Sequence, residues 1–131
     1  MNLKLFVYGT LMSKCQQAAL FFPHNAKYIE ATTLGKLIDL GEYPGMVPSD
    51  DPTDLIYGEV VIAEDKWQEV LAKLDEYEDY LACDEANSLY VRRKAVATIT
   101  ETGEKIEVWC YLYNQDIKDY PIISSGSWLE R

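Results

Sequence analysis

Hydrophobic and polar residues follow patterns along this chain that predict more strands than helices. Apolar and β-branched runs over residues 3–8, 31–40 and 55–62 each have the length and character of a strand. Two further runs, 90–100 and 105–113, are separated by a short glycine-containing segment and therefore predict a β-hairpin. The spacing leaves room for helices only between these runs.

Two helices are predicted in those intervals. A capping-box pattern begins at Ser13, so we expect a helix that starts there and ends before Pro23. A second helix is predicted over residues 65–77, with Asp65 as its N-cap. Together these elements predict an α+β fold, in which a mixed, largely antiparallel sheet closes into a small barrel with two packed helices.

Length and charge restrict the classes of function. The chain has 131 residues, of which 48% are hydrophobic, which predicts a single domain over 1–131 with one core. The formal charge of −10 argues against a nucleic-acid partner, because phosphate binding needs a basic surface. No apolar run approaches the ~18 residues of a membrane helix. Three cysteines and no signal peptide favour a reduced, cytoplasmic protein.

The single histidine also narrows the possible chemistry. A zinc site would need more His or Cys at ligand spacing, so no metal is expected. A catalytic triad would have to use His24, which follows Pro23 and is better interpreted as a solvated loop residue. A thiol enzyme that uses Cys15 is a further alternative, testable by thiol alkylation.

A candidate binding loop follows the first predicted strand. Tyr8 ends the strand, and Gly9, Thr10 and Leu11 lead towards the first predicted helix. Backbone N–H groups at such a junction can bind an anion or an oxyanion, and Gly9 has no Cβ to obstruct a ligand. The alternative is that this is an ordinary strand-to-helix turn that contains glycine and binds nothing.

The second predicted helix carries a candidate acid-base residue. At about 100° per residue, Glu78 projects onto the same face as the apolar residues of that helix, whereas Glu76 projects opposite. The apolar face consists of Trp67, Val70, Leu71 and Leu74. A carboxylate on that face is desolvated, which raises its pKa towards neutrality. Alternatively the helix ends near Tyr77 and Glu78 turns into water. Asp75 flanks the apolar face and is expected to form structural hydrogen bonds.

Aromatic residues on the last predicted strands have two interpretations. Trp109, Tyr111 and Tyr113 alternate and therefore share one strand face, as do Tyr90 and Arg92. Sheet packing explains such a pattern, and we favour it for Trp109. A pocket wall with hydroxyl and guanidinium groups is the alternative for Tyr111, Tyr113 and Arg92.

Six short motifs follow one another along nearly the whole chain. They are Tyr8-Gly9-Thr10-Leu11, Tyr43-Pro44-Gly45, Leu74-Asp75-Glu76-Tyr77-Glu78, Tyr90-Val91-Arg92, Trp109-Cys110-Tyr111 and Ser125-Gly126-Ser127-Trp128. In this order they resemble the motifs of the gamma-glutamylcyclotransferase-like (AIG2-like) superfamily, and the nearest resemblance is to its small gamma-glutamylamine cyclotransferase branch. Three positions depart from the family pattern: Thr10 replaces Ser, Asp79 stands where Gly is frequent, and Ser127 stands where Asp is common.

The resemblance implies a cyclotransferase that releases 5-oxoproline and a free amine from a γ-glutamyl amide. It implies that Glu78 is the general acid/base and that no metal or organic cofactor takes part. The expected substrate-binding residues are Tyr8, Gly9, Thr10, Leu11, Tyr111 and Arg92. The expected partner is a small γ-glutamyl molecule, with no nucleic acid and no membrane, and the oligomeric state stays open. The alternative is a domain of the same fold that binds a small ligand without turnover.

Overall fold

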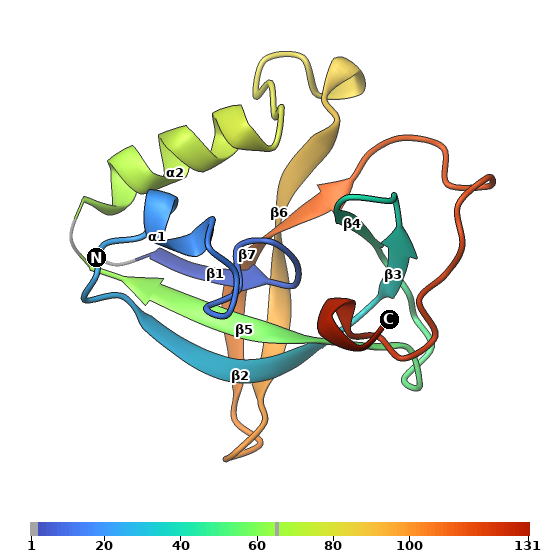
Figure 1. The fold of residues 1–131 in the computed structure, drawn as a ribbon, viewed down its shortest axis with the longest axis horizontal. Helices are drawn as coiled ribbons and strands as arrows, with labels where there is room; N and C mark the ends of the chain where they lie inside the picture. Colours follow the sequence, from blue (N-terminus) through green and yellow to red (C-terminus); the bar gives the residue numbers. More distant parts are fainter. Residues whose placement is uncertain (1–2, 65) are drawn as a thin grey trace.

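Five strands close into a barrel in the computed structural model, which describes residues 3–64 and 66–131 (Figure 1). Around the barrel the strands follow the order β1, β5, β2, β6, β7. Neighbours are antiparallel except β1 and β7, which meet in parallel at Leu5 and Trp109. The strands are β1 (Leu3–Val7), β2 (Lys27–Leu34), β5 (Leu55–Ala63), β6 (Tyr90–Ile99) and β7 (Lys105–Tyr113). The predicted mixed, largely antiparallel barrel is confirmed.

The predicted strand over residues 31–40 is wrong, because the chain leaves the barrel at Gly35. A Cβ there would lie only 3.0 Å from Ile56 Cδ1 and from the Val47 carbonyl oxygen, so a larger residue would not fit this bend. Beyond the bend, β3 (Lys36–Asp39) pairs with β4 (Pro44–Val47) in a separate two-stranded sheet. This small sheet carries Pro44 towards the N-terminal loop.

The first predicted helix is also wrong in its extent. Helix α1 covers only Ala18–Phe21, and irregular turns take up residues 9–17. Ser13 does not cap a helix, because its N–H and hydroxyl both donate to the Glu59 carboxylate, at 2.6 and 2.7 Å. A charge-assisted pair of bonds from β5 therefore replaces the predicted capping box and fixes the loop beside the barrel.

The second helix agrees with its prediction. Helix α2 covers Trp67–Tyr77 and lies outside the barrel, next to α1 (Figure 1). Val70 and Leu74 are buried, and the other two apolar residues of the predicted face pack against the core. The predicted N-cap, Asp65, lies outside the described residues. Within the described ranges every helix falls short of the length and apolar character that a bilayer crossing requires.

Two close approaches hold the parts of the fold together. A Cβ at Gly58 would collide with the carbonyl oxygen of Val7, so β1 and β5 approach as closely as they do only because position 58 is glycine. At the other end of the chain, Trp128 is buried, and the backbone of Tyr57 donates a 2.8 Å hydrogen bond to the Gly126 carbonyl. The C-terminal segment is thereby anchored to the barrel.

Candidate active site

The C-terminus of α2 places Glu78 on the inner side of the helix. The Glu78 N–H still donates to the Leu74 carbonyl at 2.8 Å, so Glu78 continues the helical path and keeps the direction of the buried face. The next residue, Asp79, has a positive φ of 54° and ends the helix. Tyr80 N–H then bonds the Asp75 carbonyl at 2.8 Å, and Asp79 N–H bonds the Glu76 carbonyl at 3.2 Å. This pair of bonds is a Schellman motif, with Asp79 in the position that glycine usually occupies.

The N-terminal loop is held against the small sheet. A Cβ on Gly9 would lie 2.6 Å from Pro44 Cγ, so glycine is required here by contact with the proline ring. The sequence-based reason for this glycine, ligand access to the backbone, is therefore incomplete. Thr10 Oγ1 shares a 3.0 Å hydrogen bond with the Tyr77 hydroxyl, which links the loop to α2. Among the described residues, no hydrogen-bond acceptor is found for the N–H groups of Gly9, Thr10 and Leu11.

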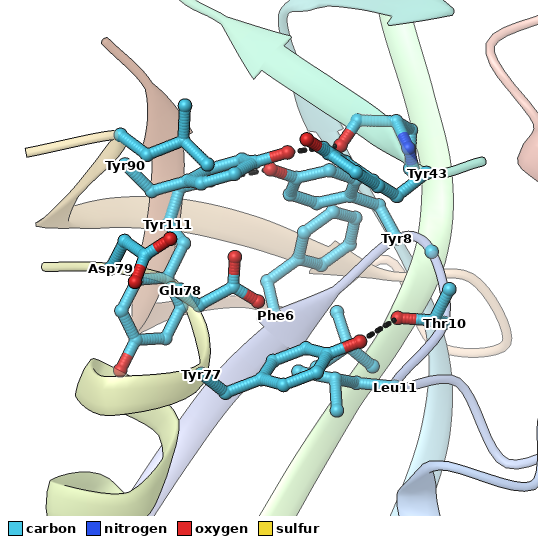
Figure 2. A pocket seen from close by; sticks show the side chains of 14 residues that line it. Phe6, Tyr8, Thr10, Leu11, Tyr43, Tyr77, Glu78, Asp79, Tyr90 and Tyr111 are labelled. Carbon is cyan, nitrogen blue, oxygen red and sulfur yellow. Dashed lines mark hydrogen bonds between the residues drawn. The ribbon is translucent and has the colours of Figure 1, made fainter. Parts of the chain in front are cut away.

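A pocket of about 210 Å³ lies between this loop and the end of α2. Figure 2 shows the Glu78 carboxylate pointing into it, towards Phe6, with Asp79 beside it. The lining residues are Phe6, Val7, Tyr8, Gly9, Thr10, Leu11, Tyr43, Pro44, Tyr77, Glu78, Asp79, Leu89, Tyr90 and Tyr111. The structure therefore brings together six of the seven predicted site residues, all except Arg92.

Three of the tyrosines present their rings to the pocket and use their hydroxyls elsewhere. Tyr8 donates to the carbonyl of Tyr111 at 2.6 Å, and Tyr90 donates to the carbonyl of Pro44 at 2.7 Å. The Tyr111 hydroxyl donates to Asp75 Oδ1 at 2.6 Å. Burial raises the pKa of all three phenols, so each stays a neutral donor to its acceptor. The pocket wall is consequently aromatic and rigid.

Glu78 is the group in this pocket that can exchange a proton near neutral pH. Desolvation, and secondarily the charge of Asp79, raise the pKa of Glu78 from 4.5 to about 8. No hydrogen bond from a described residue reaches its carboxylate. The carboxyl group is therefore available to a ligand, and it titrates close to the pH at which the protein would work. Of the two sequence interpretations, the structure supports the desolvated one.

Arg92 lies outside the pocket, contrary to its predicted role as a substrate contact. Its guanidinium forms two hydrogen bonds with the Asp75 carboxylate, at 3.0 and 3.2 Å. It also lies over the rings of Tyr80 and Trp109, at 5.4 and 4.9 Å from their centroids. Arg92 therefore pairs with α2 and supports the carboxylate that holds Tyr111, which also confirms the structural role expected for Asp75.

Sequence reasoning missed several lining residues. Tyr77 and Asp79 are the sequence neighbours of Glu78, and this adjacency could have identified them as lining residues. Tyr43 and Tyr90 were part of recognisable motifs. Only the fold shows that the turn before β4 and the start of β6 bring them to the pocket beside the N-terminal loop. His24 and Cys15 line a different hollow, and burial raises the pKa of Cys15, which disfavours a reactive thiolate.

Comparison with known proteins identifies the family. Residues 5–130 match the family model described as gamma-glutamyl cyclotransferase, AIG2-like, so the chain belongs to this family. It is similar to the gamma-glutamylcyclotransferase family protein YtfP of Escherichia coli K12, at 29% identity over 98% of each chain. The crystal structure of YkqA from Bacillus subtilis superposes with a TM-score of 0.72 at 28% identity, over 99% of this chain and 40% of that one. A mouse AIG2-like protein shares the fold, with a TM-score of 0.71 at 18% identity over 94% of this chain and 86% of that one.

Metal binding is a separate question. In the part of the chain that the structure describes, no three His, Cys, Asp or Glu side chains cluster in a way that could hold a metal ion. The expectations of a reaction without metal or cofactor, of no nucleic-acid or membrane partner and of a cytoplasmic location stay predictions.

Proposed function

We propose that this pocket releases 5-oxoproline and a free amine from a γ-glutamyl amide, with Glu78 as the general acid/base. The observation that carries the proposal is the placement of one desolvated carboxyl group opposite a loop of backbone N–H groups, in a small aromatic pocket. Its volume of about 210 Å³ is below the range typical of drug-sized ligands, which suits a small substrate.

The reaction is an intramolecular acyl transfer. The α-nitrogen of the glutamyl group attacks its own side-chain carbonyl carbon, the new C–N bond closes a five-membered ring, and the C–N bond to the leaving amine breaks. Over the whole reaction the α-nitrogen loses two protons and the leaving nitrogen gains two. Because attack is intramolecular, the protein needs chiefly to hold the folded-back conformer and to move these protons. This chemistry requires no metal or organic cofactor.

The pKa of Glu78 suits that proton transfer. A peptide α-amine titrates near pH 7.7–8.0, and the free α-carboxylate of a γ-glutamyl amide raises the pKa of its α-ammonium above that range. The pKa of about 8 brings Glu78 closer to this ammonium than an ordinary carboxylate would be. Relative to a carboxylate at the ordinary 4.5, it lowers the cost of the proton transfer by about 5 kcal/mol, at 1.36 kcal/mol per pH unit.

The N-terminal loop binds the substrate oxygens in this proposal. We place the α-carboxylate or the developing oxyanion on the N–H groups of Gly9, Thr10 and Leu11. Thr10 acts there through its backbone, because its hydroxyl is already bonded to Tyr77. Tyr8 and Tyr111 would contact the carbon chain of the substrate with their ring faces. Arg92 has no part in this arrangement.

Product analysis tests the proposal. Purified protein is incubated with a set of γ-glutamyl amides, and the products are separated and identified by mass spectrometry. We expect 5-oxoproline and free amine in equal amounts, without glutamate. Glutamate as the product would indicate hydrolysis and contradict the proposal. Saturable binding of these amides without product would instead support the alternative of a ligand-binding domain.

A further inference from the structure

The residue that follows Glu78 is held in a conformation that glycine adopts more readily. Asp79 has a φ of 54°, in the left-handed region that a side chain disfavours. Its N–H donates to the Glu76 carbonyl at 3.2 Å, and its carbonyl accepts the Leu89 N–H at 3.1 Å. These bonds fix the backbone of Asp79 on both sides, and Asp79 is part of the lining of the pocket.

The pocket has an uncompensated negative charge at this place. Among its fourteen lining residues there are two carboxyl groups and no Lys, Arg or His. Glu78 is the more buried of the two and is largely protonated at neutral pH in the free protein, whereas Asp79 is exposed. In the described part of the chain no hydrogen bond or ion pair reaches the Asp79 carboxylate. The guanidinium of Arg92 is paired with Asp75 and lies outside the lining of the pocket.

Aromatic rings in the pocket lining also favour a positively charged ligand group. Tyr43, Tyr77 and Tyr90 line the pocket together with Asp79 (Figure 2). A cation placed near the face of an aromatic ring is attracted by the ring's electron density. The combination of a free carboxylate and aromatic faces attracts a cationic group on a ligand and repels an anionic one.

We propose that Asp79 is a specificity-determining residue that selects γ-glutamyl amides whose leaving amine carries a second, positively charged group. An ω-ammonium alkylamine is the chemical class that fits, and an amine that carries a carboxylate is disfavoured. This inference rests on the proposed function, since it assigns the leaving amine to the Asp79 side of the pocket. The glutamyl group then occupies the space between Glu78 and the loop.

Three substrates of matched length test the proposal. They are the γ-glutamyl amides of 1,4-diaminobutane, of pentylamine and of 4-aminobutanoate, which end in an ammonium, a methyl group and a carboxylate. For the wild-type protein we expect kcat/KM for 5-oxoproline release to be about five- to twentyfold higher for the cationic than for the anionic substrate, since each interaction with an exposed charge is modest. Most of this difference between the two substrates should arise from KM rather than from kcat. The ratio should decrease as salt is added.

The variant Asp79→Asn removes the charge while keeping a side chain that tolerates the left-handed conformation. The cation-to-anion ratio should fall close to one. The control is Glu76→Gln, which removes an exposed negative charge from another face of the same helix. This variant should keep the wild-type ratio. The comparison of ratios cancels any effect of Asp79 that is common to all substrates, such as its influence on Glu78.

A ratio that Asp79→Asn leaves unchanged would overturn the proposal. If turnover then falls equally for all three substrates, Asp79 acts on the step that they share, through the glutamyl group or through Glu78. If no substrate is turned over, the proposed reaction fails, and calorimetry then measures the affinity of the same three compounds. A preference for the cationic compound that Asp79→Asn abolishes would still support the role of Asp79, whereas equal affinities or no binding would reject it.

Discussion

Replacing Glu78 by Gln should stabilise the protein at alkaline pH and have little effect at pH 5. Glu78 is the carboxyl group that the fold desolvates at the end of α2, and its pKa rises from 4.5 to about 8 on folding. A glutamine has similar volume and cannot lose a proton. The difference in unfolding free energy between the variant and the wild type therefore isolates the cost of ionising this one group.

The sign and size follow from proton linkage. Between pH 4.5 and about 8 the folded protein keeps a proton on Glu78 that the unfolded chain has lost, so wild-type stability falls as pH rises. Below pH 4.5 both states are protonated, and above pH 8 both are ionised, so the effect is constant outside this window. At 1.36 kcal/mol per pH unit, the full loss is at most about 5 kcal/mol, and at pH 5 it is below about 1 kcal/mol.

Urea denaturation at pH 5 and pH 9, with a reductant for the free cysteines, measures this difference. Glu76→Gln is the matched control, since it removes a carboxylate from the exposed side of the same helix. We expect Glu78→Gln to gain about 2–5 kcal/mol over this control at pH 9, and less than about 1 kcal/mol at pH 5. A gain that is the same at both pH values would refute the desolvated carboxyl group and the reasoning built on it.

Three other substitutions test the neighbouring structure. Asp79→Gly should relieve the left-handed strain, which is worth about 1 kcal/mol, and should lower the pKa of Glu78 in a carboxyl NMR titration, because a neighbouring negative charge is lost; an unchanged pKa would contradict that coupling. Gly9→Ala should destabilise the fold by about 1–3 kcal/mol through contact with Pro44, and a variant of wild-type melting temperature would show that the loop can move away. Arg92→Lys, which loses the two-pronged contact with its carboxylate partner, should cost about 1 kcal/mol and leave KM unchanged, whereas a raised KM would place Arg92 at the substrate.

Local patterns sufficed for the features that depend on neighbours in sequence. Two strand-like runs, 90–100 and 105–113, joined by a short glycine-containing segment, predicted the hairpin of β6 and β7. Helical periodicity predicted that Glu78 lies on the apolar face of α2. Both features depend on residues that are close together in the sequence. The closure of the barrel followed from having several such strands and few helices.

The features that could not be predicted depend on contacts between residues far apart in the sequence. The capping box at Ser13 failed because the carboxylate of Glu59, 46 residues away, takes its donors. Arg92, expected at the substrate, lies outside the pocket lining because Asp75 on α2 pairs with its guanidinium. Likewise, only the fold shows that Pro44 supports Gly9, since the small β3–β4 sheet delivers it there.

The most direct test of the account is the rate of 5-oxoproline release by Glu78→Gln, compared with wild type and Glu76→Gln at saturating γ-glutamyl amide. Circular dichroism and thermal unfolding confirm that each variant is folded before its rate is measured. If Glu78 moves the protons of the cyclisation, kcat should fall by roughly 10²–10⁴-fold in Glu78→Gln, with a much smaller change in KM, and Glu76→Gln should match wild type. A folded Glu78→Gln protein that forms 5-oxoproline at near the wild-type rate would contradict the central claim.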